Sequence, residues 1–513
     1  MRMDRNIKPL GAKQVRPDGM LLRDDQGRHW LPRGINLVYK GRKTKEGGYD
    51  FYPPDWPDDL MLRLKRLGVD LVRQGILWAA LEPKPGLYDE GAFAFIARQL
   101  DKAANAGISV ILDMHQDLYT QRFSDGAPDW AVMTDQPFLA TDLWSDAYLF
   151  SPAVQQSWDA FWDNARVPAT GLGLQDHFAA LWQEIARRFS GHPALLAFDI
   201  LNEPAPGTPI VGMFTDLLGA FASLLSAQEA QALGLQTMDE DALTRVFMEP
   251  EQKLMALSFL EDEARFWQLG TACAPRVQAF ERDVLGPFYN KVAAAIRAVD
   301  QDSFLLRAHN YLSNLGIPPS ITPITVNGQP DPRQIFTPHG YDLVVDTAAI
   351  ELASDSRART IFKRHRQTQQ ALKLPVIVGE WGAFSDSANA LRHGDSLMRQ
   401  FEDYLWPSTY WCYEPRFFDL PAARLLARPK ASAVAGTLQS VTFDQASGSF
   451  TASWQEPRQP EDDMTSLFWT PFAIRDCTLD GLPCDQALQA DADGFIHIPA
   501  RGGQRRLTFI IKR

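Results

Sequence analysis

The sequence predicts an α/β protein: a (β/α)8 TIM barrel followed by a C-terminal antiparallel β-sandwich. Three observations support this fold class. Apolar, strand-like runs recur along the first 430 residues with helical patterns between them, which is typical of βα units around a parallel sheet. Several of these runs end abruptly in polar or charged residues, as strands do at the catalytic face of a barrel. After residue 430 the helical patterns stop and short alternating runs begin.

Each βα unit is located by an apolar run and the helical pattern that follows it. The expected barrel strands are Arg33–Val38, Leu71–Trp78, Ile108–His115, Leu196–Asn202, Phe304–His309, Gln334–Tyr341, Val376–Glu380 and Thr409–Tyr413. The clearest helical patterns between them are Leu60–Leu67, Phe93–Ala106, Phe178–Phe189 and Phe288–Val299.

Two connections are much longer than a βα loop requires, at about residues 116–176 and 205–280. Connections of this length are usually functional when they are ordered. The first is rich in aromatic residues. The second carries apolar residues at helical spacing from Ile210 to Leu225. That apolar face either packs on the rim of the barrel or meets a lipid tail or a membrane surface.

The change of pattern near residue 430 predicts two domains: a catalytic barrel over residues 1–430 and a β-sandwich over 431–513. Alternating runs such as Ser440–Phe443, Ser449–Trp454 and Leu507–Ile511 are separated by Gly, Asp and Pro. Short strands with such turns are typical of a small sandwich.

Composition excludes several classes of protein. The chain has 513 residues, 45% hydrophobic and 22% charged, with a formal net charge of −12. That charge argues against nucleic acid as a partner and against purely electrostatic docking on anionic lipid. The N-terminal run Met1–Lys8 is followed by no apolar segment, so no secretory signal is visible and a cytoplasmic location is expected.

The four cysteines form no close metal-ligand pair. Cys477 and Cys484 either bridge a loop or remain free thiols, as is usual in a reducing compartment. The sequence does not indicate an oligomeric state.

Two glutamates at strand ends are the main candidates for catalysis. Glu203 lies in Asn202-Glu203-Pro204, directly after an apolar run, and Glu380 ends the run that begins at Val376. Strand-end carboxylates distant in sequence meet at the mouth of a barrel. A pair about 5 Å apart is what a retaining glycosidase requires, one group acting as acid/base and the other as nucleophile.

Other strand ends carry polar and aromatic residues that a simple sheet does not need. Arg73 lies inside the second strand, where a buried guanidinium requires a carboxylate partner such as Glu380. Such a partner is expected to lower the pKa of Glu380 and keep it ionised. His339 and Tyr341 share a face at the sixth strand, and Trp411 on the eighth offers a flat surface for a sugar ring.

The third strand ends in Asp113, His115 and Asp117, which lie on one side by the strand period of two. This trio could bind a metal ion, but no further ligands cluster nearby in the sequence. Hydrogen bonding to sugar hydroxyls is the favoured interpretation.

These motifs resemble glycoside hydrolase family 5, the retaining (β/α)8 hydrolases, through Asn202-Glu203-Pro204 and Gly379-Glu380-Trp381-Gly382. The match extends to Arg73, His115, His339-Gly340-Tyr341 and Trp411. The segments 113–119 (Asp-Met-His-Gln-Asp-Leu-Tyr) and 125–130 (Asp-Gly-Ala-Pro-Asp-Trp) resemble endoglycoceramidases and their glucosylceramidase and sterylglucosidase relatives.

The resemblance implies a role for each residue. Glu203 would be the acid/base, with a raised pKa, and Glu380 the nucleophile. Asn202 would bind the sugar 2-hydroxyl, while Asp113 and Lys40 would hold outer hydroxyls of a glucose. The mechanism needs no metal and no organic cofactor, and the partner is a glycolipid or glycoside substrate.

Three interpretations remain open at this point. The first is a β-glycosidase that cuts between a sugar and a lipid, with transient membrane-surface contact. The second is an endo-β-glucanase-type hydrolase of soluble β-glucan, or a simple β-glucosidase. The third is a non-catalytic carbohydrate-binding protein on a barrel scaffold.

Overall fold

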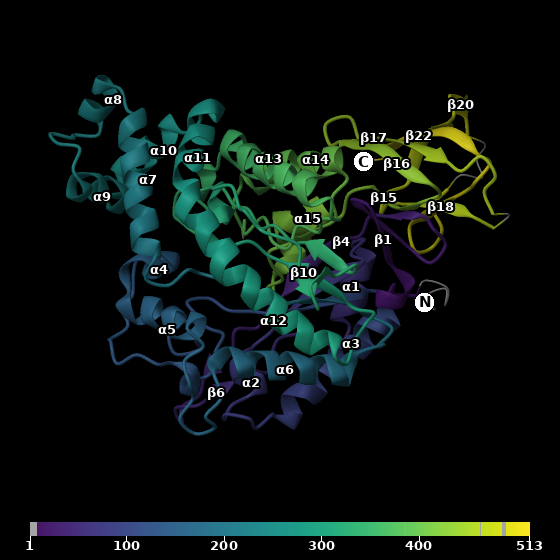
Figure 1. Cartoon of the computed structure of the whole chain (residues 1–513). Coiled ribbons are helices and arrows are strands. Elements are labelled where there is room, and N and C mark those ends of the chain that lie inside the picture. The colour runs from purple at the N-terminus through teal and green to yellow at the C-terminus, as the bar shows by residue number, and fades with distance from the viewer. Residues whose placement is uncertain (1–7, 385, 462, 485–488, 513) are drawn as a thin grey trace.

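The computed structural model describes residues 8–384, 386–461, 463–484 and 489–512 (Figure 1). Most of the N-terminal run considered for a signal, residues 1–7, lies outside these residues. None of the described helices combines the length and hydropathy needed to cross a membrane.

The central sheet is a curled parallel sheet. Its strands follow the order β13 (Gln334–Phe336), β10 (Phe304–Arg307), β9 (Leu195–Asp199), β8 (Ser109–Met114), β7 (Leu71–Ile76), β4 (Arg33–Leu37) and β14 (Ser408–Tyr410). The segment 376–380 closes it, because Val376 bridges Phe336 on one side and Val378 bridges Ser408 on the other, both in parallel. The predicted TIM barrel is confirmed.

The observed strands are shorter than expected at their C-terminal ends. The expected strand Leu196–Asn202, for example, ends at Asp199, and Gln334–Tyr341 ends at Phe336. Beyond these points the backbone leaves the ladder, which places the chemistry-bearing residues in loops above the sheet. Apolar residues from the strands fill the barrel, among them Leu71, Ile111 and Ile377, all fully buried.

Four of the helices that cover the barrel correspond to the predicted patterns: α1 (Leu60–Arg66), α3 (Glu90–Ala106), α6 (Leu174–Phe189) and α12 (Gly286–Arg297). The sequence analysis named no pattern for two others, α13 (Asp355–Leu372) and α14 (Ala390–Tyr404). The helix α3 shows why its bounds are sharp. The Asp89 side chain accepts the Ala92 N–H at the start, and Gly107 ends it in the left-handed region with φ 68°.

The two long connections form helical additions. The first contains α4 (Ala147–Phe150) and α5 (Pro152–Trp162). The second contains α7 (Ile210–Leu224), α8 (Ala227–Ala232), α9 (Glu240–Met248), α10 (Pro250–Phe259) and α11 (Glu263–Phe280). In Figure 1 this second group, drawn in teal, projects from the side of the barrel opposite the yellow C-terminal strands.

The C-terminal part consists of two antiparallel sheets. One joins β16 (Thr437–Asp444), β17 (Ser449–Glu456), β22 (Gly503–Ile511), β19 (Ile474–Leu479) and β20 (Leu482–Pro483). The other joins β15 (Lys430–Val434), β18 (Thr465–Trp469) and β21 (Phe495–Pro499) to three strands from the N-terminus, β1 (Arg16–Asp18), β2 (Leu21–Arg23) and β3 (His29–Trp30). Sequence reasoning did not foresee this N-terminal contribution.

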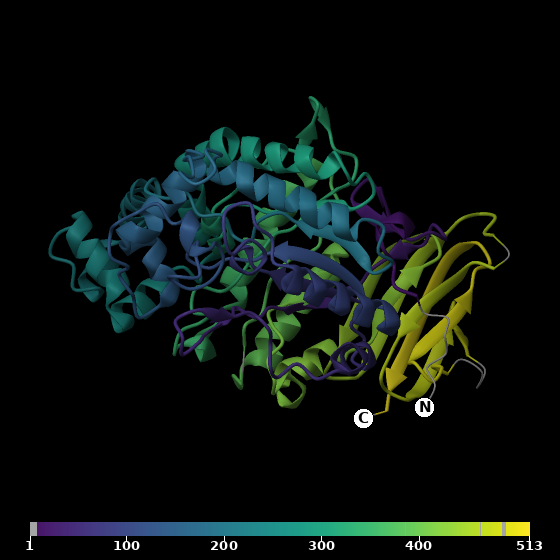
Figure 2. The ribbon, with the colours of Figure 1, turned by 90° about the horizontal axis from the view of Figure 1, so that it is seen from below.

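The sandwich packs near the N-terminal ends of the barrel strands, away from the strand ends that carry the glutamates. Lys430 donates to the carboxylate of Asp70 and to the carbonyl of Gly68, just before β7 begins. Trp469 covers Gly68, where an added Cβ would lie 2.5 Å from its ring. Figure 2 shows the same arrangement, with the sandwich at one end of the molecule and the helical addition at the other.

Candidate active site

Glu203 and Glu380 meet above the C-terminal end of the sheet. Their carboxylates and the His339 ring each offer an atom within 4.8 Å of the others. Glu203 follows β9 with φ 41°, a left-handed conformation that is uncommon for a residue other than glycine. The Gln116 side-chain amide donates to the carbonyls of Asn202 and Glu203, at 2.9 and 3.0 Å, and so holds this turn in place.

Arg73 anchors Glu380 from below. This guanidinium is fully buried, and its Nη1 donates to Glu380 Oε1 at 2.7 Å. The same side chain donates to Asp199 at 2.8 Å and to the side-chain oxygen of Asn202 at 2.9 Å. A buried cation needs such partners to offset its desolvation. The predicted pairing of Arg73 with Glu380 is therefore present.

His339 and Tyr341 connect the two glutamates. The Tyr341 hydroxyl donates to Glu380 Oε2 at 2.8 Å. The His339 Nδ1 lies 2.9 Å from Glu203 Oε1 and 3.7 Å from Glu380 Oε2. Burial lowers the pKa of His339 to about 4, so its ring is neutral at pH 7. A neutral imidazole that donates from Nδ1 stabilises Glu203 without adding a charge.

The two oxygens of Glu203 differ in their surroundings. Oε1 accepts from the Asn314 side-chain amide at 2.6 Å and faces His339 Nδ1 at 2.9 Å. Among the residues that the structure describes, no hydrogen-bond partner is found for Oε2. The proton of a neutral Glu203 is therefore placed on Oε2, where it is free to be donated to a bound molecule.

Burial raises the pKa of both carboxyl groups. The pKa of Glu203 rises to about 8, with the charge of Asp117 adding to the effect. The pKa of Glu380 rises to about 7 by burial, although the charge of Arg73 lowers it. The expectation that its partners would lower the pKa of Glu380 below its usual range is therefore wrong, because desolvation outweighs them. The ion pair with Arg73 and the hydrogen bond from Tyr341 nevertheless favour the charged form of Glu380 over that of Glu203.

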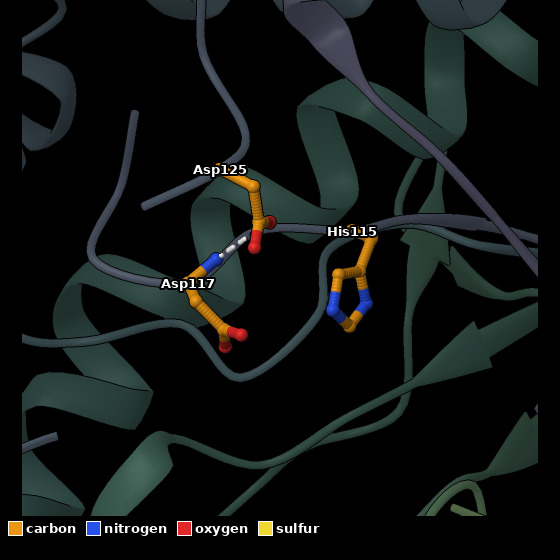
Figure 3. Close-up of side chains that lie close together, drawn as sticks. All are labelled: His115, Asp117 and Asp125. Carbon is orange, nitrogen blue, oxygen red and sulfur yellow. Dashed lines mark hydrogen bonds between the residues drawn. The ribbon is translucent and has the colours of Figure 1, made fainter. Parts of the chain in front are cut away.

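A second group of side chains lines the mouth beside this pair (Figure 3). The His115 ring stacks on Trp411 with centroids 5.1 Å apart, and its buried Nε2 has no partner among the described residues. Asp117 lies next to Asp125, whose carboxylate accepts the Asp117 backbone N–H at 3.0 Å. The Lys40 ammonium contacts both carboxylates and lies 5.4 Å from the centre of the Trp411 ring.

His115, Asp117 and Asp125 are close enough to share a metal ion. The Lys40 ammonium, however, already supplies a positive charge to both aspartates. An ion-pair cluster accounts for these residues without a metal, and its free polar atoms suit sugar hydroxyls.

Asp113 is placed differently from the expectation. Its carboxylate is fully buried, 2.8 Å from Arg73 Nη2 and 2.9 Å from His115 Nδ1. The strand period that puts Asp113 on the same side as His115 also puts it one layer deeper in the barrel. The predicted direct contact with a sugar hydroxyl is therefore corrected: Asp113 supports Arg73 and His115.

Three residues of the site were missed by sequence reasoning: Asn36, Asp199 and Asn314. Asn36 accepts from Arg73 at 3.0 Å, and Asp199 is the acid at the end of an otherwise apolar strand. Asp199 could have been recognised from the sequence as a site residue, because a buried charge requires a partner. Asn314 lies in the turn after β10 and carried no comparable signal.

The sequence matches known families over most of its length. Residues 39–231 and 261–416 match the model described as cellulase (glycosyl hydrolase family 5). The chain belongs to glycosyl hydrolase family 5. Residues 428–482 match the C-terminal domain of glycoside hydrolase family 5. The resemblance read from the strand-end motifs is confirmed.

Curated proteins similar to this chain carry the names of enzymes that act on glycolipids. The endoglycoceramidase of Hydra vulgaris is 28% identical over 254 residues, which are 44% of this chain and 48% of that protein. The glucosylceramidase of Rhizopus delemar is 23% identical over 428 residues, 66% of this chain and 61% of that protein. The chain thus spans about half the length of the first relative and under two thirds of the second.

The solved structure of endo-glycoceramidase II from Rhodococcus sp. has the same fold. It superposes with a TM-score of 0.70 at 22% identity and covers 97% of this chain and 100% of that chain.

The Tyr341 hydroxyl gives a first prediction. Replacing Tyr341 by Phe removes a hydrogen bond to an ionised carboxylate, of about 1.5–3 kcal/mol, so kcat/KM for an aryl β-glucoside is expected to fall about 10–100-fold. Because the hydroxyl favours the charged form of Glu380, its loss raises that pKa. The acidic limb of the pH–kcat/KM profile then moves to higher pH, while the basic limb stays in place.

Tyr88→Phe is the matched control, since Tyr88 packs against Phe93 outside the site. If the pH–kcat/KM profile of Tyr341→Phe superposes on that of Tyr88→Phe, the assigned role of the Tyr341 hydroxyl toward Glu380 is contradicted.

Proposed function

We propose that this chain is a retaining β-glycosidase that hydrolyses the bond between a β-linked glucose, or a glucose-rooted glycan, and a lipid such as ceramide. The observation that carries the proposal is the pair Glu203 and Glu380, with oxygens within 4.8 Å of each other. Retaining enzymes hold their carboxyl groups about 5–5.5 Å apart, whereas inverting enzymes need roughly 6.5–9.5 Å for an intervening water.

In the first step Glu380 attacks the anomeric carbon, and Glu203 donates its Oε2 proton to the leaving oxygen. The lipid alcohol departs and a glycosyl ester forms on Glu380. The charge of Glu380 is thereby lost, and Glu203 is left as a carboxylate. In the second step Glu203 takes a proton from water, whose oxygen attacks the same carbon and releases the sugar with its β configuration retained. Both glutamates return to their starting states.

The surrounding side chains support the two steps. Arg73 and Tyr341 hold the nucleophile from two directions. For Asn202 the proposal keeps the role that the family resemblance implies, a contact with the sugar 2-hydroxyl that strengthens in the transition state. Lys40, His115, Asp117 and Trp411 provide charged, polar and aromatic surfaces for the remaining hydroxyls and the ring.

Replacing each glutamate separates the two roles. Glu380→Gln is expected to abolish turnover of every glycoside. Glu203→Ala is expected to retain the first step for 2,4-dinitrophenyl glucoside, whose leaving group needs no proton, and external azide is expected to restore release as β-glucosyl azide. A Glu203→Ala enzyme with full activity on a natural glycolipid, or an α-configured azide, would sink the assignment.

The substrate is tested by product analysis. The wild-type chain is incubated with glucosylceramide, with lactosylceramide and with a soluble β-glucan. Release of ceramide from the first two supports the proposal, and the released sugar distinguishes glucose from whole-glycan removal. Oligosaccharides from the β-glucan with no ceramide release would instead support the endoglucanase alternative.

We further propose that the helical addition at residues 205–280 contacts the lipid surface that presents the substrate. Four of its apolar side chains are 40–49% exposed: Val211, Met238, Met248 and Met255. Exposed methionines are common on surfaces that bind varied apolar partners. The addition reaches the rim of the site, because Phe214 of α7 packs against Phe150 of α4 with ring centroids 6.0 Å apart. Trp144, in the turn just before α4, has its ring centre 5.7 Å from the Lys40 ammonium of the site.

The charge of this element restricts the lipid. Between residues 226 and 262 there are eight acidic and two basic side chains. A surface of uncharged or zwitterionic lipid therefore suits it better than an anionic one.

The double variant Met238→Glu and Met248→Glu tests this contact. It is expected to lower kcat/KM on glucosylceramide in phosphatidylcholine vesicles by roughly tenfold or more, since two partly buried thioethers are lost from the interface. Turnover of a soluble aryl glucoside should not change. Met20→Glu, at another exposed methionine (37%) in the turn between β1 and β2, is the control. Equal vesicle activity of variant and control would refute the contact.

A further inference from the structure

Two buried histidines lie behind the acid/base side of the site. His309 follows β10, His365 lies in α13, and their exposed fractions are 2% and 0%. Their rings stack almost in parallel, with centroids 4.7 Å apart and an interplanar angle of 3°. Within the described part of the chain, neither residue has a hydrogen bond or ion pair with Glu203 or Glu380, and the steps described above use neither.

Both rings bind the backbone of His339. The His309 Nε2 accepts the His339 N–H at 3.1 Å. The His365 Nε2 lies 2.9 Å from the His339 carbonyl oxygen, to which it donates. The peptide groups on both sides of His339 are thus held by side chains from two other elements.

The hydrogen bonds define one proton arrangement for each ring. The His309 Nδ1 lies 2.9 Å from the carbonyl of Asn310, so it carries the proton and leaves Nε2 as an acceptor. His365 must carry its proton on Nε2, and its buried Nδ1 has no partner among the described residues. Burial lowers the pKa of His309 to about 3 and that of His365 well below its usual value, so both rings stay neutral.

The backbone of His339 determines where its ring points. On one side the ring faces Gly379, where an added Cβ would lie 2.5 Å from His339 Nε2. On the other side Nδ1 faces Glu203 Oε1 at 2.9 Å. Since the ring fits between these two groups, a small rotation of the His339 backbone lengthens the contact with Glu203.

We propose that His309 and His365 are positioning residues that clamp the His339 backbone and thereby aim Glu203 at the glycosidic oxygen. This inference rests on the proposed role of Glu203 as acid/base. With the clamp in place, His339 and Asn314 both hold Oε1, and Oε2 presents the proton. Without it, Glu203 rotates away from the position in which protonation of a leaving oxygen is efficient.

Leaving-group dependence distinguishes positioning from a merely structural role. His309→Phe and His365→Phe keep a flat buried ring but remove the bond to the backbone. For alkyl or methylumbelliferyl glucosides, which need the proton, kcat/KM is expected to fall about 100-fold, as a misplacement near 1 Å does. For 2,4-dinitrophenyl glucoside, which does not need it, the fall should stay within about threefold, which corresponds to roughly 0.7 kcal/mol.

Conservative variants and a control complete the experiment. In His309→Gln and His365→Gln the amide reaches the position of the imidazole Nε2. The wild-type dependence of kcat/KM on the leaving group should therefore largely return. His393→Phe is the control, since His393 is equally buried (1%) but binds Asp355 on the outer helices. If the Phe variants fail to fold, His365→Asn, whose amide is too short to reach the carbonyl, takes their place.

An equal loss of kcat/KM for all leaving groups, or no loss for any, overturns the proposal. Failure of the acid/base assignment itself is recognised separately, because Glu203→Ala would then retain activity on poor leaving groups.

Discussion

One buried guanidinium holds the base of this active site together. Arg73 lies on β7 and binds side chains from β4, β8 and β9 and from the closing segment 376–380: Asn36, Asp113, Asp199 and Glu380. Each partner comes from a different part of the barrel wall. The site therefore has its geometry only when the barrel is closed, because the last partner lies on the segment that closes it.

The charges around Arg73 do not cancel. One cation faces three carboxyl groups in a fully buried layer, so complete ionisation of all three would leave an excess of negative charge. The pKa of Asp113 is accordingly raised to about 7 by burial, even though Arg73 lowers it. A proton held in this layer reduces the repulsion on Glu380, so the ionisation of Glu380 depends on the groups beneath it.

Much of the architecture was predictable because its signals are local. In the apolar runs that end in Asn202-Glu203-Pro204 and at Glu380, a few neighbouring residues indicate both the strand and the site residue at its end. The clamp on His339 was not predictable, because His309, His339 and His365 meet only after three elements pack together. The pKa of Glu380 was misjudged for a similar reason: its charged neighbours were visible in the sequence, but its depth was not.

The three N-terminal strands β1, β2 and β3, which join the second sheet of the sandwich, affect how the chain folds during its synthesis. Trp30 of β3 pairs with Ala433 of β15, and Val15, Leu22 and Trp30 seal the floor of the barrel. At ribosomal speeds of about 5–20 residues per second, these strands wait roughly 20 to 80 seconds for their partner strand to be synthesised. During that time their apolar side chains and strand edge are uncovered. The strands β1, β2 and β3 can pair with one another early, but the outer edge of β3 is paired only after β15 has been synthesised.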